Sequence, residues 1–165
     1  MNTTQLIGFV AFGAATLACA QRARSEPKYW WALTTANAVL FIEILANTRH
    51  QVHDLANAFL VELGMYEFRS RWQMVLTAVV LVLLLAAMYL AHSRIRSRPA
   101  AAASAGVCFG VGVFAAEIIS LHAVDVFLYR TVGSLSVISL VWLATSAWIC
   151  TSAFVSTQSE TPSRR

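Results

Sequence analysis

Acidic and histidine side chains gather on or near one side of the apolar segments, and these are the residues that could do chemistry. Of eight acidic residues six fall there, as do three of four histidines. They are Glu43, Asp54, Glu62, Glu67, Glu117, Asp125, His50, His53 and His122. Glu43 and Glu117 lie inside apolar runs, where an ionised side chain costs on the order of 3 kcal/mol at the centre of a membrane helix. Such side chains usually face the interior of a helix bundle and find a partner there.

A divalent transition metal is one ligand that this set could hold. Neutral imidazoles and carboxylates suit zinc, copper, iron or manganese. The spacing matches no metal-binding signature, and the histidine-rich boxes of membrane di-iron desaturases are absent. The candidate ligands are His50, His53, His122 and Asp125. A b-type haem would need two facing histidines, which could be His50 or His53 opposite His122, and is not the cofactor that we expect.

Acid/base catalysis on a lipid-like substrate is a second possibility. A carboxyl group in a site of low dielectric can keep its proton near neutral pH and donate it. Glu43 or Glu117 would fill that role, with a histidine or Asp125 as its partner. The candidate catalytic residues are Glu43, Glu117, His122 and Asp125.

Helical spacing would bring some of these residues together. His50 and Asp54 follow Glu43 by 7 and 11 residues, which places all three within about 20° of one stripe if a single helix continues that far. A second group, spaced by three and four residues, comprises His122, Asp125 and Tyr129. The two groups can meet if the helices that carry them pack together.

The same groups could instead satisfy one another. The arginines on this side would balance nearby carboxylates and tie the loops to the helix ends; they are Arg49, Arg69, Arg71 and Arg130. A protein built in this way would be an accessory or structural membrane subunit. We favour that function over a membrane enzyme or a metal-binding protein, and the sequence leaves open whether the chain is an enzyme.

Membrane-spanning helices must position these residues. The 165-residue chain is 58% hydrophobic and 12% charged, with a mean hydropathy of +0.64, whereas soluble proteins carry about 25% charged residues. A span needs about 20 mostly apolar residues. The sequence predicts an all-α integral membrane bundle, one domain over residues 1–155, with a disordered cytoplasmic tail over 156–165. The predicted spans are about 6–20, 29–48, 72–91, 100–121 and 132–155.

Two further patterns concern packing. In the longest loop, apolar residues at helical spacing predict a short amphipathic helix on the outer surface, with Asp54 as its cap; they are Leu55, Phe59, Leu63 and Tyr66. Gly106 and Gly110 form a GxxxG that we expect to pack internally, with a dimer interface as the alternative. The cysteines lie in apolar runs and are interpreted as small packing residues; they are Cys19, Cys108 and Cys150.

Basic residues predict the orientation. Eight fall on one side of the predicted spans: Arg22, Arg24, Lys28, Arg94, Arg96, Arg98, Arg164 and Arg165. The other side has four. The positive-inside rule therefore places the first group on the cytoplasmic side of what we expect to be a bacterial inner membrane. The amino terminus is then outside and the carboxyl terminus inside. We expect the lipid bilayer, and other membrane subunits or a homo-oligomer, as partners. Nucleic acid is not expected, because no basic stripe is interleaved with aromatics.

Two motifs resemble those of a known family. The segment 64–73, GMYEFRSRWQ, resembles GWYExRRxxQ, and the segment 120–125, SLHAVD, resembles S-[LF]-H-x-[VI]-D. Together they resemble a family of small bacterial multi-pass membrane proteins of unknown function, over about residues 47–142. Met65 and Ser70 depart from the family pattern. The resemblance implies a common outer-face set: Tyr66, Glu67, Arg69, Gln73, His122 and Asp125. The polar network that we predict comprises Asp54, Tyr66, Glu67, Arg69, Gln73 and Tyr129.

Overall fold

Five helices long and apolar enough to cross a membrane dominate the part of the chain that the structure describes. The computed structural model describes residues 3–64, 66–119 and 122–158, without the side chains of residues 49, 50, 66, 122, 123 and 156–158. The five helices are α1 (Thr3–Ala23), α2 (Pro27–Ala46), α4 (Arg69–Arg94), α5 (Arg98–Ile119) and α7 (Val137–Gln158). The predicted all-α membrane bundle is thereby confirmed.

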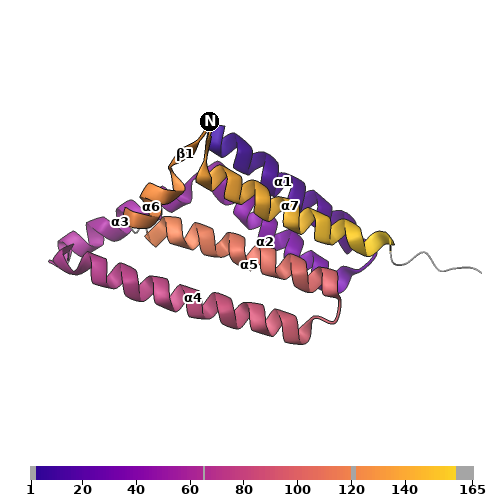
Figure 1. Ribbon diagram of the computed structural model, residues 1–165. Helices are drawn as coiled ribbons and strands as arrows, with labels where there is room; N and C mark the ends of the chain where they lie inside the picture. Colours follow the sequence, from indigo (N-terminus) through magenta and orange to yellow (C-terminus); the bar gives the residue numbers. More distant parts are fainter. Residues whose placement is uncertain (1–2, 65, 120–121, 159–165) are drawn as a thin grey trace, which may run out of the picture.

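Shorter elements connect the long helices at one end of the bundle, which we call the hairpin end (Figure 1). They are α3 (Thr48–Glu62), the 3-10 helix η1 (Tyr66–Phe68), α6 (His122–Leu128) and the strands β1 (Thr131–Val132) and β2 (Leu135–Ser136). The strands pair antiparallel, with Thr131 opposite Ser136. Gly133 has φ 64° in the turn between them, a conformation that glycine adopts without steric cost.

The opposite end of the bundle carries most of the basic residues that the structure describes, and we call it the basic end. It contains the connections from α1 to α2 and from α4 to α5 (Figure 1). Its cations are Arg22, Arg24, Lys28, Arg94, Arg96 and Arg98. The alternating direction of the spans explains this grouping. Every second connection between spans lies on the same side, so the α1–α2 and α4–α5 connections share one end.

Two apolar clusters form the core, which lies among α1, α2, α5 and α7. The cluster nearer the basic end is rich in small residues, including Ala15, Ala18 and Ala103. The cluster nearer the hairpin end is aromatic: the rings of Phe114 and Trp142 stack with centroids 5.7 Å apart. Alanine lets the helix backbones approach closely at one end, while aromatic rings fill the space between the helices at the other.

The GxxxG residues pack inside the bundle, as predicted, and not on an exposed dimer face. A Cβ on Gly106 would lie 2.8 Å from Cγ1 of Ile149 on α7. A Cβ on Gly110 would lie 3.4 Å from Leu40 on α2 and 3.6 Å from Thr145 on α7. Both glycines are buried, so their lack of a side chain serves contacts within this chain.

Helix α4 stands apart from this core. It packs chiefly on α5, and none of its residues, all of which the structure describes, is buried. The helices α1 and α5 bury eight residues each. An apolar groove of about 480 Å³ runs between α4 and α5, and Figure 1 shows α4 along one edge of the molecule.

Three predicted boundaries are wrong. The second span ends at Ala46, because Asn47 adopts a left-handed conformation (φ 52°) and donates its N–H to the carbonyl of Glu43 at 2.7 Å. Asparagine tolerates this conformation, which ends a helix. The amphipathic helix α3 exists but begins at Thr48, so Asp54 does not cap it. The last span begins at Val137 and not at residue 132, because the hairpin precedes it.

The surface helix and the cysteines also have clear placements. Leu55 and Phe59 on α3 are exposed, at 72% and 58%, so the apolar side of α3 is open to the surroundings of the bundle. The three cysteines are free, and Cys19 packs in the small-residue cluster. This placement agrees with their interpretation as packing residues. Only the first residues of the predicted tail, up to Gln158, are described, and they continue α7.

Candidate functional site at the hairpin end

Glu117 lies in the last turns of α5 and is one of the buried charged residues among those the structure describes, with 7% exposed. The hydroxyl of Tyr129 donates a hydrogen bond of 2.7 Å to its Oε1. Tyr129 follows α6, whose return along the chain brings the phenol back over the end of α5. A hydrogen bond to a carboxylate is worth about 1.5–3 kcal/mol, so this contact offsets part of the cost of burying Glu117.

Aromatic and aliphatic residues near this pair in the sequence belong to the apolar core. Phe114 precedes Glu117 by one helical turn and stacks on Trp142, and Leu128 precedes Tyr129 and is 7% exposed. All three apolar residues belong to the aromatic cluster. The aromatic cluster therefore includes the helical turn before Glu117 and the residue before Tyr129, and the polar contact to the carboxyl group comes from the segment after α6.

The carboxyl end of α5 receives two side-chain donors. Nδ1 of His53, on α3, lies 3.2 Å from the carbonyl oxygen of Ile118, and Nε2 of Gln73, on α4, donates to the carbonyl of Ile119 at 2.8 Å. The last carbonyl groups of a helix have no partner within that helix. Residues from two other helices thus contact two of these terminal carbonyl groups, and one of those residues, Gln73, belongs to the polar network that we predicted.

The hydrogen bonds of His53 indicate which ring nitrogen donates and which accepts. A carbonyl oxygen only accepts, so Nδ1 carries the proton toward Ile118, and Nε2 accepts from Nδ2 of Asn57 at 2.8 Å. Both ring nitrogens of His53 are therefore hydrogen-bonded within the protein. To bind a metal ion, His53 would have to lose one of these two hydrogen bonds. Among the described residues no group of three or more His, Cys, Asp or Glu could hold a metal ion. The side chains of His50 and His122 lie outside the described residues.

Glu43 has a partner of a different kind. It is half-buried near the end of α2, and the hydroxyl of Thr48 donates to its Oε1 at 3.3 Å. Because α2 ends at Ala46, Asp54 belongs to a separate helix and is exposed. The predicted stripe of Glu43, His50 and Asp54 on one helix is therefore wrong in its premise.

The remaining predicted residues occupy the same end of the bundle. Glu67 is exposed on η1, whereas Arg69 at the start of α4 and Asp125 on α6 are half-buried. Both Arg69 and Asp125 have interactions within the protein. The side chain of Tyr66 lies outside the described residues. The predicted residues thus share one end of the bundle, and the contacts that link α3, α4, α5 and the segment after α6 are made by His53, Gln73 and Tyr129.

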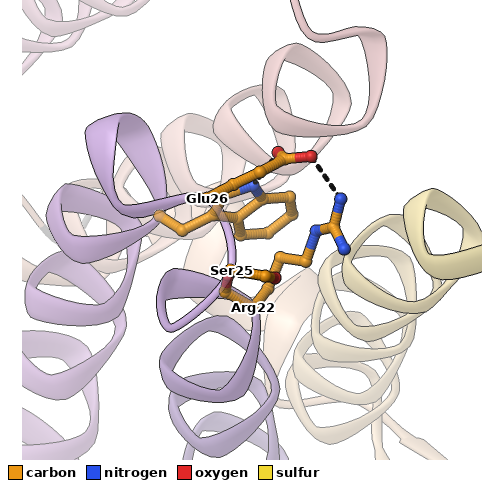
Figure 2. A network of polar contacts seen from close by, with 4 residues as sticks. Arg22, Ser25 and Glu26 are labelled. Carbon is orange, nitrogen blue, oxygen red and sulfur yellow. Dashed lines mark hydrogen bonds and ion pairs between the residues drawn. The ribbon is translucent and has the colours of Figure 1, made fainter. Parts of the chain in front are cut away.

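A second polar site, at the basic end, was not predicted. Arg22 is 4% exposed, and its guanidinium forms an ion pair with Glu26 (Figure 2). The other carboxylate oxygen of Glu26 accepts from the indole N–H of Trp30 at 3.1 Å. The hydroxyl of Ser25 donates to the carbonyl of Arg22. The i, i+4 spacing of Arg22, Glu26 and Trp30 was visible in the sequence, but a loop rather than a buried cluster was expected there.

A buried amide was also missed. Asn37 on α2 is fully buried, and its Nδ2 donates to the carbonyl of Leu33 at 2.8 Å. Its Oδ1 has no hydrogen-bond partner among the described residues. The only signal in the sequence is that this uncharged amide lies in the middle of an apolar run.

The fold and these contacts define a class: a multi-pass helical membrane protein with a polar network at one end and a basic cluster at the other. No family model, curated protein or solved structure matches the chain. The motif resemblance described above therefore stays a prediction.

Proposed function

We propose that the chain is an accessory subunit of a bacterial inner-membrane assembly, with its hairpin end facing the periplasm. One observation carries the proposal: side chains from α3 and α4 and from the segment after α6 converge on the end of α5. Those contacts are His53 to Ile118, Gln73 to Ile119 and Tyr129 to Glu117. Polar groups that are buried between helices must find partners inside the protein, so a network of this kind serves to hold these elements together.

A subunit also needs a surface through which it meets its partner, and α4 supplies one. It has 26 residues, none buried, and the stretch from Trp72 to Ala91 has no charged side chain. The apolar groove between α4 and α5 continues this surface. The occupant that we propose is a transmembrane helix of a different membrane protein, because α4 packs chiefly on α5 and none of its residues is buried, which leaves an apolar face free to pack on another helix.

Photo-crosslinking in membranes tests this surface. A photoreactive amino acid at Val82, exposed on α4, should give one discrete adduct with another membrane protein. The matched control is the same amino acid at Leu17, exposed on α1, which should give none. Adducts with lipid alone would contradict the proposal, as would adducts only with a second copy of this chain, which would indicate a homo-oligomer.

An enzyme is the second candidate, and the buried Glu117 with its phenolic partner favours it. In that case Glu117 would be the general acid or base acting on a lipid-like substrate. The variant Glu117→Gln keeps an oxygen that accepts from Tyr129 but cannot exchange a proton. A subunit should retain its membrane level, its α4 adduct and its rescue of a deletion strain. Loss of rescue with the level and adduct unchanged would favour the enzyme.

A metal-binding role can be tested separately. Purified protein should contain no stoichiometric transition metal, and its melting temperature should not change with a chelator. One equivalent of bound zinc, copper, iron or manganese that the chelator removes with a fall in melting temperature would establish the metal alternative.

A further inference from the structure

A polar cleft of about 520 Å³ opens at the basic end of the bundle. It lies between the connection from α1 to α2 and the connection from α4 to α5. The residues that line it are Glu26, Pro27, Lys28, Tyr29, Arg94, Arg96 and Ser97. The hydroxyl of Tyr29 donates to the carbonyl of Arg94 at 3.3 Å, so the two connections are held together across the cleft.

The charge of this cleft is positive. Lys28, Arg94 and Arg96 are exposed, and none of them forms a salt bridge with another residue that the structure describes. The single carboxylate in the lining, Glu26, is already paired with the buried Arg22 (Figure 2). It also accepts a hydrogen bond from the indole N–H of Trp30. Lys28 Nζ lies 5.3 Å from the centroid of the Tyr29 ring, a contact that leaves its charge in place. The three cations therefore give the cleft a net positive charge that can attract an anion.

The start of α2 adds to this positive character. Pro27, Lys28 and Tyr29 form its first turn, and the side chain of Glu26 does not cap it. The first N–H groups of a helix lack partners within that helix, and its amino terminus carries a partial positive charge. Helix amino termini with free N–H groups favour phosphate.

We propose that this cleft binds the phosphate headgroup of an anionic phospholipid. The cleft lies where the spans end, and Trp31, in the next turn of α2, is 54% exposed. Exposed aromatic residues of this kind lie at the level of lipid headgroups, and basic pockets between membrane helices recognise anionic ones. A headgroup in the cleft would leave its acyl chains beside Trp31, along the lipid-facing side of α2, which a soluble anion would not use.

Lipid titration of the purified full-length chain in a neutral detergent tests this proposal. The probes are phosphatidylglycerol, phosphatidylcholine of the same chain length, and inorganic phosphate. Melting temperature should rise with phosphatidylglycerol and change little with the other two. The double variant Lys28→Gln/Arg96→Gln should raise the apparent Kd for phosphatidylglycerol about tenfold or more, as expected for losing charge-assisted contacts.

The matched control is Arg24→Gln, which removes an exposed charge from the same connection but does not line the cleft. It should bind phosphatidylglycerol like the unaltered protein. An equal loss in this control would overturn the assignment, as would equal responses to both lipids or to phosphate. If the double variant does not show the helical circular dichroism of the unaltered protein, Arg96→Gln alone serves, and unchanged affinity in it would also contradict the site.

Discussion

The hydroxyl of Tyr129 donates a 2.7 Å hydrogen bond to the buried carboxyl group of Glu117, across twelve residues of sequence. The chain leaves α5, forms α6 and returns, so the contact closes the hairpin end over the aromatic cluster. This relationship gives α6 a fixed position relative to α5. It also gives Glu117 a partner that a straight helix could not supply.

Removing the phenol hydroxyl should destabilise the bundle. We expect Tyr129→Phe to lower the free energy of unfolding by about 1–3 kcal/mol, because the buried carboxyl group loses its hydrogen-bond donor. Denaturation of the purified protein in detergent micelles measures this. Tyr89→Phe is the control, since Tyr89 on α4 is 72% exposed; equal effects in the two variants would contradict the role of the contact.

The donor at the end of α5 should matter in the same way. Gln73→Leu leaves the carbonyl of Ile119 without the side-chain donor that it now has, at a cost of about 1–3 kcal/mol. Hydrogen exchange in the last turn of α5 should accelerate together with the loss of stability. Gln51→Leu, at an exposed position of α3, should leave both quantities unchanged, and faster exchange in that control would argue against a specific contact.

The glycine at the α5–α7 contact should not accept a larger side chain. In Gly106→Val the new Cβ alone would approach Ile149 to 2.8 Å, and overpacking of this kind costs about 1–3 kcal/mol or more. Melting temperature and membrane level should both fall. Ala78→Val introduces the same two Cγ methyl groups at an exposed position of α4 and should have little effect. If Gly106→Val keeps a normal melting temperature and membrane level, α5 and α7 do not pack as closely as described.

The buried arginine should contribute more than its exposed neighbour. Arg22→Met leaves Glu26 without its ion-pair partner, and we expect a loss of about 1–3 kcal/mol, since one member of a partly buried pair remains uncompensated. Arg24→Met removes the same charge from an exposed position and should stay within about 0.5 kcal/mol. Unfolding of both variants under one condition measures the difference, which should vanish if the pair is only a surface contact.

Orientation is directly measurable with reporters. After Arg165, a reporter that works only in the cytoplasm should be active. Next to Asn57, a reporter that works only after export should be active, because the basic end, with its excess of cations, is expected to face the cytoplasm. The opposite pattern would place the network of Glu117 and Tyr129 in the cytoplasm. The proposed lipid cleft would then face the outer leaflet.

Sequence by itself determined the number and character of the spans. Five apolar runs of membrane length must become helices in lipid, because every backbone group needs a partner within the segment. Similar reasoning predicted that Glu117 needs a partner inside the bundle, because it lies within an apolar run. Tyr129 entered the predicted polar network through its helical spacing from Asp125, and Gln73 only through the motif resemblance.

Only the tertiary structure decided which groups those partners are. The left-handed Asn47 separates Glu43 from Asp54, and no local pattern required that break. The donors to α5 come from α3, α4 and the segment after α6, so helix packing alone makes them neighbours. Arg22 looked like a solvated loop cation, yet the turn between α1 and α2 buries it against Glu26. Local physics sets where helices form, whereas partners distant in sequence depend on how those helices pack.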